Sequence, residues 1–167
     1  MTPTELYVFL NRLFKQQVCL NKSANDTSLS LDDYIGFRSI EQNIELYGLE
    51  TTEEQIVLIN KDVDGMPRKR HKKRLANIFD KIRTENSNSC EETDWYSNME
   101  IDFKFNETCI NSLILTDRNN KWMGNIREKL VSNNCFIAVG LSHLMYQCGL
   151  INQLKELGYT ITPIDVK

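Results

Sequence analysis

The sequence has little of what marks fibrous, membrane-spanning or serine-hydrolase proteins. Only 7 of its 167 residues are glycine and 3 are proline, which excludes collagen-like and low-complexity classes. It contains no Gly-x-Ser-x-Gly motif, so the nucleophile elbow of acyl-transfer enzymes is absent. No apolar run reaches the ~18–20 residues that cross a bilayer, and residues 1–5 lack the basic and apolar regions of a signal peptide. The sequence predicts a soluble chain of about one domain. It leaves the compartment open, because an export signal could lie upstream.

Cysteine is present but without a recognisable framework. The five cysteines are an odd number at irregular spacings, and none forms a Cys-x-x-Cys pair. Neither a set of disulfides nor a thiolate zinc site is therefore predicted. We expect mostly buried or half-buried free thiols. The five are Cys19, Cys90, Cys109, Cys135 and Cys148.

The net charge of −3 is unevenly distributed. Residues 67–74 hold six of the 20 Lys and Arg, so the rest of the chain carries 14 basic against 23 acidic residues, a net charge of −9. The basic run has no interleaved aromatic residues for base stacking, and no familiar nucleic-acid motif surrounds it. A solvated helix face is the better explanation, and no nucleic-acid partner is expected.

Apolar spacing and capping patterns predict several helices. Capping boxes at Thr2–Glu5 and Thr51–Glu54 each precede an amphipathic stretch, and a further helix is predicted to begin near Ser30. The remaining expected helices are residues 66–83, 108–115, 122–131 and 150–157, with a loop at 116–120 between the middle two.

The C-terminal third indicates a parallel sheet. Residues 135–139 form a continuous apolar run typical of a strand buried on both faces. Residues 159–164 alternate as a second strand after the helix at 150–157, which makes a βαβ unit. With a further short strand at 44–49, the predicted fold class is α/β, a mostly parallel sheet with flanking helices.

Two polar segments follow predicted strands, where ligands bind in open parallel sheets. His143 comes after the first C-terminal strand, and Glu50 comes between a strand and a helix. We expect both to face one crevice at the same edge of the sheet. A histidine and a carboxylate can bind a divalent metal or share acid and base work. The spacing alone favours the alternatives, a structural histidine and a glutamate that complements a helix dipole.

Four motifs in order carry a family resemblance. They are residues 31–34 (LDDY), residues 48–55 (GLETTEEQ), Arg118-Asn119 with Trp122-Met123, and residues 136–144 (FIAVGLSHL) with 149–151 and 154–163. Together these motifs resemble the TraB/GumN family, which includes the Tiki proteins. The resemblance covers nearly the whole chain as one domain, residues 1–167. It implies an α/β fold related to the erythromycin esterase and ChaN group, and a metal-dependent hydrolase of peptidase type.

The resemblance also implies site residues. The family pattern has two Gly-x-x-His motifs with an acid between them, and only the second is here, ending at His143, with Glu50 as the matching acid. We expect the family's N-terminal strand and first histidine motif to lie upstream of Met1, which leaves this chain's site incomplete. His143 and Glu50 are the candidate metal ligands and acid/base residues. Arg118 either binds a substrate carboxylate or oxyanion or forms a structural ion pair.

Two functions stay open, a hydrolase acting on a peptide or protein and a non-catalytic interaction module that keeps the fold. We expect no organic cofactor. The chain alone should bind a divalent metal weakly and have little hydrolytic activity, because catalytic zinc sites usually need three protein ligands. A sheet without its N-terminal strand would expose an edge, so self-association or a bound complementary segment is also expected.

Overall fold

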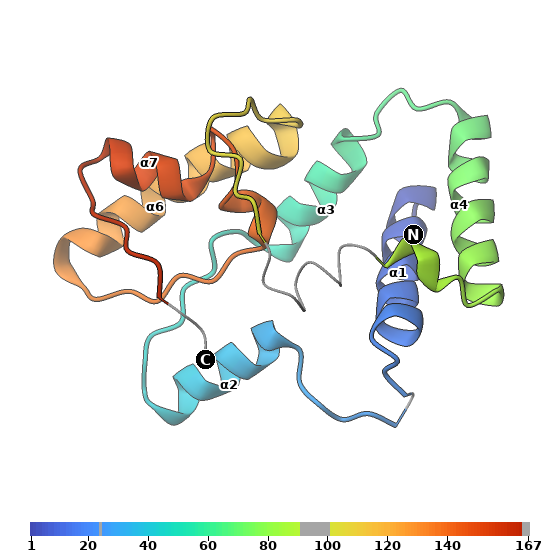
Figure 1. Cartoon of the computed structure of the whole chain (residues 1–167), viewed down its shortest axis with the longest axis horizontal. Coiled ribbons are helices and arrows are strands. Elements are labelled where there is room, and N and C mark those ends of the chain that lie inside the picture. The colour runs from blue at the N-terminus through green and yellow to red at the C-terminus, as the bar shows by residue number, and fades with distance from the viewer. Residues whose placement is uncertain (24, 91–100, 165–167) are drawn as a thin grey trace. The chain divides into compact units, whose positions relative to one another are not determined.

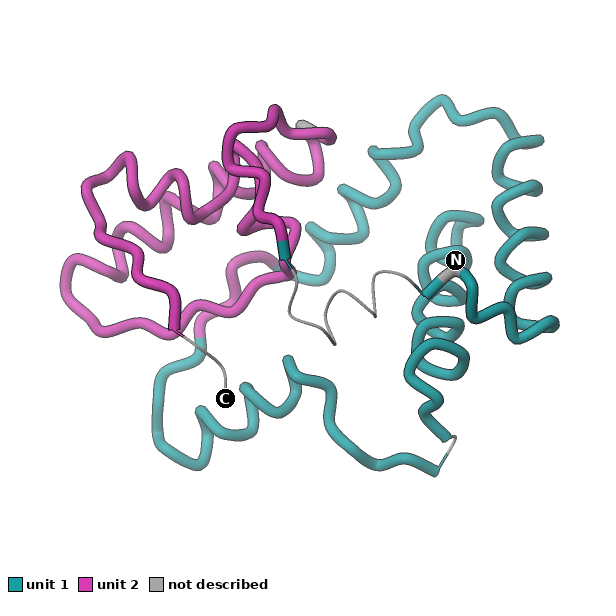
Figure 2. The backbone as a smooth tube through the Cα atoms, viewed as in Figure 1, with its two compact units in different colours: residues 1–46, 51–101 teal, residues 47–50, 102–167 magenta. Residues whose placement is uncertain are grey.

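The structure is a computed structural model that describes residues 1–164 except 24 and 91–100. The described residues contain helices and no strand (Figure 1). They form two compact units, Met1–Leu46 with Thr51–Ile101 and Tyr47–Glu50 with Asp102–Lys167 (Figure 2). The helices are α1 (Pro3–Phe14), η1 (Lys15–Cys19), α2 (Leu31–Glu41), α3 (Thr52–Lys61), α4 (Arg68–Arg83), η2 (Ser87–Ser89), η3 (Ser112–Thr116), α6 (Asp117–Ser132), η4 (Leu141–His143) and α7 (Leu150–Glu156).

The first unit is built around an apolar contact between α1 and α4. Leu10 and Phe14 of α1 pack with Ile78 of α4, and each of the three is buried. The spacing of four residues between Leu10 and Phe14 places both on one face of α1. A disulfide between Cys19 and Cys90 ties η1 to the segment after α4.

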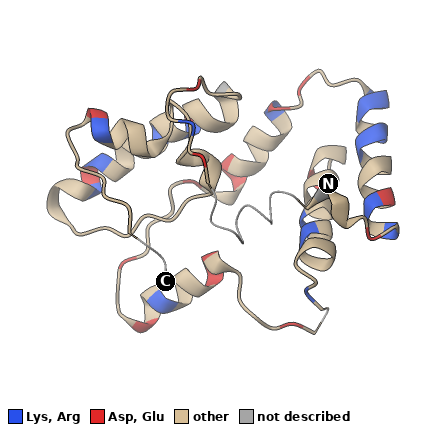
Figure 3. Ribbon diagram, viewed as in Figure 1, with Lys and Arg blue, Asp and Glu red and all other residues tan. Residues whose placement is uncertain are grey.

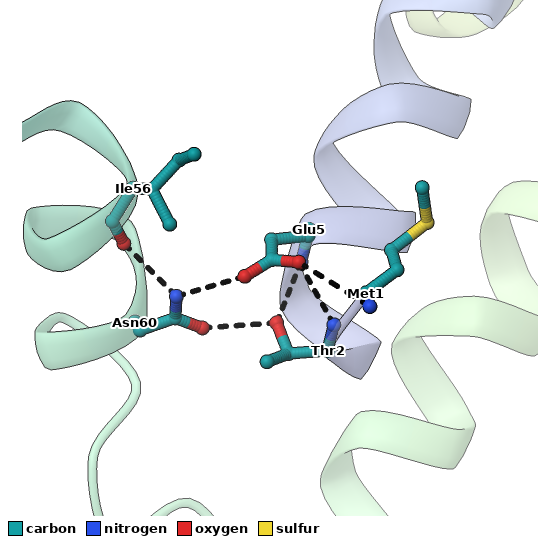
Figure 4. Close-up of polar contacts among 5 residues, drawn as sticks. All are labelled: Met1, Thr2, Glu5, Ile56 and Asn60. Atoms are coloured by element: carbon teal, nitrogen blue, oxygen red, sulfur yellow. Dashed lines mark hydrogen bonds and ion pairs between the residues drawn. The ribbon is translucent and has the colours of Figure 1, made fainter. Parts of the chain in front are cut away.

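A polar network at the start of α1 links this helix to α3 (Figure 4). The Glu5 amide donates to Thr2 Oγ1 at 3.2 Å and the Thr2 amide donates to Glu5 Oε2 at 2.9 Å, which forms the predicted capping box. Asn60 Nδ2 donates to Glu5 Oε1 at 3.0 Å, and Thr2 Oγ1 donates to Asn60 Oδ1 at 2.9 Å. The Asn60 hydrogen bond and then the Thr2 amide lower the pKa of Glu5.

Most of the predicted helices are confirmed. Capping boxes precede α1 and α3, Ser30 caps α2, and α4 covers most of the predicted basic helix. The predicted loop at 116–120 is wrong, because residues 117–120 are the first turn of α6. Among the described residues, no helix has the length and apolarity needed to cross a bilayer.

The second unit is built on α6. Trp122, Met123 and Ile126 of this helix pack against Leu150 of α7, and all four are buried. Leu49, from the segment 47–50, also packs on this cluster. A disulfide between Cys109 and Cys148 links the segment before η3 to the segment before α7.

The predicted α/β fold with a parallel sheet and a C-terminal βαβ unit is wrong for the described residues, which contain no strand. The helix of that unit exists as α7, but its two flanking segments do not pair. No backbone hydrogen bond joins residues 134–139 or 160–164 to another described segment. Phe136 is 81 % exposed, whereas a strand buried on both faces would hide it. An apolar run becomes a strand only where a second backbone supplies hydrogen bonds, and none is supplied here.

The cysteine prediction is also wrong. Four of the five cysteines form the disulfides Cys19–Cys90 and Cys109–Cys148, and the fifth, Cys135, is free and exposed. The partners are 71 and 39 residues apart, so the spacing along the chain gave no sign of the pairing. Each disulfide lies within one unit.

Several large apolar side chains of α2 are exposed, and contact with a second chain would bury them. Self-association stays a prediction, which sedimentation can test. The side chains are Leu31, Tyr34, Phe37 and Ile40.

Candidate functional site

The segment Tyr47–Glu50 is fixed along α6 at three points. The Tyr47 ring lies 4.7 Å from the ammonium group of Lys129, near the end of the helix. Leu49 packs on the Trp122 cluster, and Glu50 contacts Arg118 in the first turn. This segment runs antiparallel to the helix and delivers the Glu50 carboxylate to its N-terminal end.

Glu50 and Arg118 form a bidentate ion pair. Arg118 Nε donates to Glu50 Oε2 at 3.1 Å, and Arg118 Nη2 donates to Glu50 Oε1. The Glu50 side chain is 5 % exposed and that of Arg118 is 19 % exposed, so water screens the pair little. The carboxylate neutralises the guanidinium, and both of its oxygens accept hydrogen bonds from Arg118.

Asn119 organises the residues beside this pair. It is fully buried, and its Nδ2 donates to the backbone oxygens of His143 at 3.2 Å and Cys148 at 2.8 Å. Because Nδ2 serves two carbonyls, Oδ1 is the atom that faces His143 Nδ1, at 2.7 Å. Oδ1 can only accept, so His143 carries its proton on Nδ1 and keeps a bare lone pair on Nε2.

His143 is neutral at physiological pH. Its pKa is lowered from 6.5 to about 4. The largest cause is burial, since a charged imidazole loses hydration there. The positive charge of Arg118 also lowers the pKa, while the negative charge of Glu50 partly raises it. The imidazole ring lies 4.3 Å from the Trp122 ring, and the Arg118 guanidinium carbon lies 4.7 Å from the centre of that indole. Glu50, Arg118, Trp122, His143 and Asn119 thus form one continuous cluster, named here the His143 cluster.

The indole N–H of Trp122 is a buried donor with no acceptor among the residues that the structure describes. Trp122 is 4 % exposed, so bulk water does not solvate this group. A buried unpaired donor costs about 1–3 kcal/mol. An oxygen acceptor on a bound molecule would remove that cost.

The segment that carries His143 is held at both ends. The His143 amide donates to the Gly140 oxygen at 2.9 Å, which forms the turn η4. A Cβ at Gly149 would overlap the backbone oxygens of Leu144 and Met145, so only glycine fits there. The disulfide from Cys109 anchors the same segment at Cys148.

The cluster does not by itself fit a metal ion. Within residues 1–23, 25–90 and 101–164 there is no group of three His, Cys, Asp or Glu residues that could hold one. His143 Nε2 is suited to ligation, because Nδ1–H is fixed by a carbonyl oxygen. Glu50 is not, since Arg118 takes both of its oxygens. The unpaired group nearby, the indole N–H, is a donor and suits an oxygen acceptor rather than a cation.

The structure brings together the three site residues predicted from the sequence, Glu50, Arg118 and His143. The described part of the chain lacks the sheet edge that was predicted to unite them, and the contacts come from α6, η4 and the segment 47–50 instead. Arg118 forms the ion pair that was one of its two predicted alternatives. The catalytic and metal-binding roles of the three stay predictions. Sequence reasoning missed Asn119 and Trp122 as members of the cluster.

A sequence signal for Asn119 did exist. It stands three, four and seven residues before the apolar Trp122, Met123 and Ile126, which is the spacing of one helix face. A polar residue on an apolar stripe indicates a buried amide with partners elsewhere in the chain.

Comparison with known proteins gives one finding. The chain matches the family model described as the TraB/PrgY/gumN family over residues 6–163. Neither the comparison with individual curated proteins nor that with solved structures yields a match. The matched region includes Glu50, Arg118, Asn119, Trp122 and His143. Because the match spans most of the chain, this protein belongs to the TraB/PrgY/gumN family.

Proposed function

We propose that this chain is a hydrolase of peptidase type whose reacting groups are in the His143 cluster. The observation that carries the proposal is the neutral imidazole of His143, with a bare lone pair on Nε2, beside a buried indole N–H that has no acceptor. When a water molecule attacks a carbonyl carbon, two kinds of group assist. A base accepts the proton of the water, and a hydrogen-bond donor stabilises the negative charge on the carbonyl oxygen.

The proton steps follow from the tautomer. His143 Nε2 accepts a proton from a water molecule as the water oxygen bonds to the carbonyl carbon of the substrate. The imidazolium then returns this proton to the leaving amine as the carbon–nitrogen bond breaks. Asn119 Oδ1 accepts from His143 Nδ1 throughout and fixes the tautomer in which Nε2 carries the free lone pair.

The donors of the cluster suit the oxygen of the substrate carbonyl. The Trp122 indole N–H is available, and the Arg118 guanidinium adds positive charge nearby while it remains paired with Glu50. Both favour negative charge developing on an oxygen atom. No step is assigned to a metal ion, because the described residues contain no group of three His, Cys, Asp or Glu side chains that could bind one.

A second function, the non-catalytic interaction module, has its own supporting observation. Both oxygens of Glu50 accept hydrogen bonds from Arg118. His143 is only 6 % exposed, so the cluster is closed to solvent. A closed polar cluster of this kind stabilises a fold without chemistry. The two functions differ in whether a substrate turns over.

The test is hydrolysis of an unstructured protein and of a fluorogenic peptide library by the full chain, with and without a chelator. We expect slow hydrolysis that His143→Gln reduces at least about 100-fold, the range of general base catalysis. Ser142→Ala is the matched control, because Ser142 is the exposed neighbour of His143. Its activity should equal that of the unchanged protein.

The outcomes separate the two functions. Hydrolysis that depends on His143 and survives the chelator supports the proposal. Peptide binding without turnover, in a folded protein, supports the interaction module instead. Restoration of activity by added zinc or manganese after chelation would show that a metal acts where we assign none. Calorimetry of these metals against His143→Ala tests the weak metal binding predicted from the sequence.

A further inference from the structure

The first turns of α4 carry a positively charged surface that has no acidic partner among the residues described by the structure. Arg68, Lys69, Arg70, Lys72 and Lys73 are all exposed, and these five residues are named here the α4 cationic surface. In Figure 3 the beginning of α4 is blue. At 100° per residue the five side chains cover every side of the helix except the stripe that packs on α1.

None of these five residues forms an ion pair with the part of the chain that the structure describes. Their neighbour Arg74 differs, because its guanidinium carbon lies 4.1 Å from the centre of the Tyr7 ring and Nη1 lies 3.7 Å from Met66 Sδ. Arg74 therefore has a structural role within the unit. Within residues 1–23, 25–90 and 101–164, no hydrogen bond, ion pair or ring contact is found for the side chains of the other five cations.

The location of these charges lowers the stability of the helix. Three of them occupy the first turn of α4, where the helix dipole favours negative groups, and that turn has no acidic residue and no side-chain cap. The other described helices of ten or more residues each have an acidic residue in the first turn. An external anion would remove both the dipole penalty and the repulsion among the five cations.

The dimensions of the surface limit what binds there. Six residues of helix rise about 9 Å, which matches about three residues of an extended peptide. Asp62 and Asp64 precede the surface and Asp80 follows it. A duplex or a lipid bilayer is much larger than this patch and would bring its phosphates against these carboxylates. A short acidic segment would contact the cations alone.

We propose that the α4 cationic surface binds a short segment rich in Asp and Glu on a partner protein. The cations distributed around the helix suit carboxylates that project from several sides of an extended peptide. The proposal concerns the first unit and is independent of the chemistry assigned to the His143 cluster.

The probe is a fluorescein-labelled peptide of eight glutamates, titrated with the full chain at low and at physiological salt. We expect saturable binding that weakens steadily with salt concentration. The variant with Arg68→Gln, Arg70→Gln and Lys72→Gln should bind roughly 10–100-fold more weakly, because each exposed ion pair contributes about 1.5–5-fold. The matched control changes Arg12, Lys61 and Arg127 to Gln, three exposed cations outside the surface, and should bind as the unchanged protein does.

A second variant separates binding from folding. Arg68→Glu with Lys69→Glu places two carboxylates in the first turn of α4, where the helix dipole favours them. We expect this variant to unfold at a higher temperature while it loses peptide binding.

Four results would overturn the proposal. They are absence of binding at low salt, equal weakening in the control variant, tighter binding of a DNA duplex or of phosphatidylserine vesicles through the same residues, and self-association that the Gln substitutions abolish. The last two would assign the surface to a different class of partner.

Discussion

The two compact units each have an apolar core, but they differ in the polar groups that are buried beside it. In the first unit, apolar side chains of α1 and α4 form the core, and the polar contacts of Figure 4 lie at its exposed rim. In the second unit, Asn119 and His143 are buried beside Trp122, so part of the core is polar. Apolar packing tolerates small shifts, whereas a buried polar group must keep its partners. The second unit should therefore be more sensitive to single changes and to pH.

The disulfides give the largest effects and test whether the units respond separately. Replacing Cys19 and Cys90 by Ala, or Cys109 and Cys148 by Ala, should each lower the free energy of unfolding by about 4 kcal/mol through loss of loop closure. Only the second pair should also change hydrogen exchange in η4, because Cys148 anchors the segment with His143. Urea unfolding with exchange mass spectrometry measures both. Equal exchange changes in η4 from the two variants would contradict the comparison.

Asn119→Ala tests the polar core. It removes both donor bonds to the oxygens of His143 and Cys148 and leaves His143 Nδ1–H without its acceptor. We expect a loss of about 3 kcal/mol in unfolding free energy. The control is Asn120→Ala, since Asn120 is exposed and accepts only from Gln153 in the described contacts. A loss below 1 kcal/mol for Asn119→Ala would show that the network contributes little.

Acid should destabilise the second unit through His143. The pKa of His143 is about 4 in the folded protein and 6.5 when unfolded, so the unfolded chain binds a proton first as the pH falls. The stabilisation is fully present above pH 6.5 and is lost between pH 6.5 and 4, by about 3 kcal/mol in total. Exchange of the α6 amides at pH 7 and at pH 4.5 reports it. His143→Gln should flatten this dependence, and an unchanged slope in that variant would assign the effect elsewhere.

The smallest expected effects come from the helix caps of the first unit. Thr2 and Thr51 each close a capping box, but only Thr2 also donates to Asn60. Thr51→Ala should cost about 1 kcal/mol, and Thr2→Ala about 0.5–1.5 kcal/mol more because of the added hydrogen bond. Thermal unfolding of the two variants measures the difference. Identical values would mean that the link from α1 to α3 adds no stability.

The helices were predictable because their signals are local. The capping boxes at Thr2 and Thr51, the cap at Ser30 and the apolar spacing of α4 each depend on residues within one or two turns. Whether an apolar run forms a strand was not predictable in this way, and the described residues contain no strand. An apolar run such as residues 135–139 has the same composition whether or not a second strand lies beside it, and only the pairing makes it a strand.

The candidate site was predictable in its members and not in its arrangement. The family motifs indicated Glu50, Arg118 and His143 together, but the pairing of Glu50 with Arg118 depends on a contact across 68 residues of sequence. The predicted loop at 116–120 hid the site further, because Asp and Asn usually favour turns. Here the side-chain amide of Asn119 donates to the backbone oxygens of His143 and Cys148 rather than bonding to the backbone next to it. The helix α6 therefore continues through this residue.

The free thiol of Cys135 bears on how this protein must be handled. It is exposed, and a free thiol can attack an accessible disulfide of the same or of another chain and open an exchange of partners. The attacking species is the thiolate, and such rearrangement therefore accelerates as the pH rises. Samples kept at mildly acidic pH, or carrying Cys135→Ser, should keep a single set of cross-links during purification and storage.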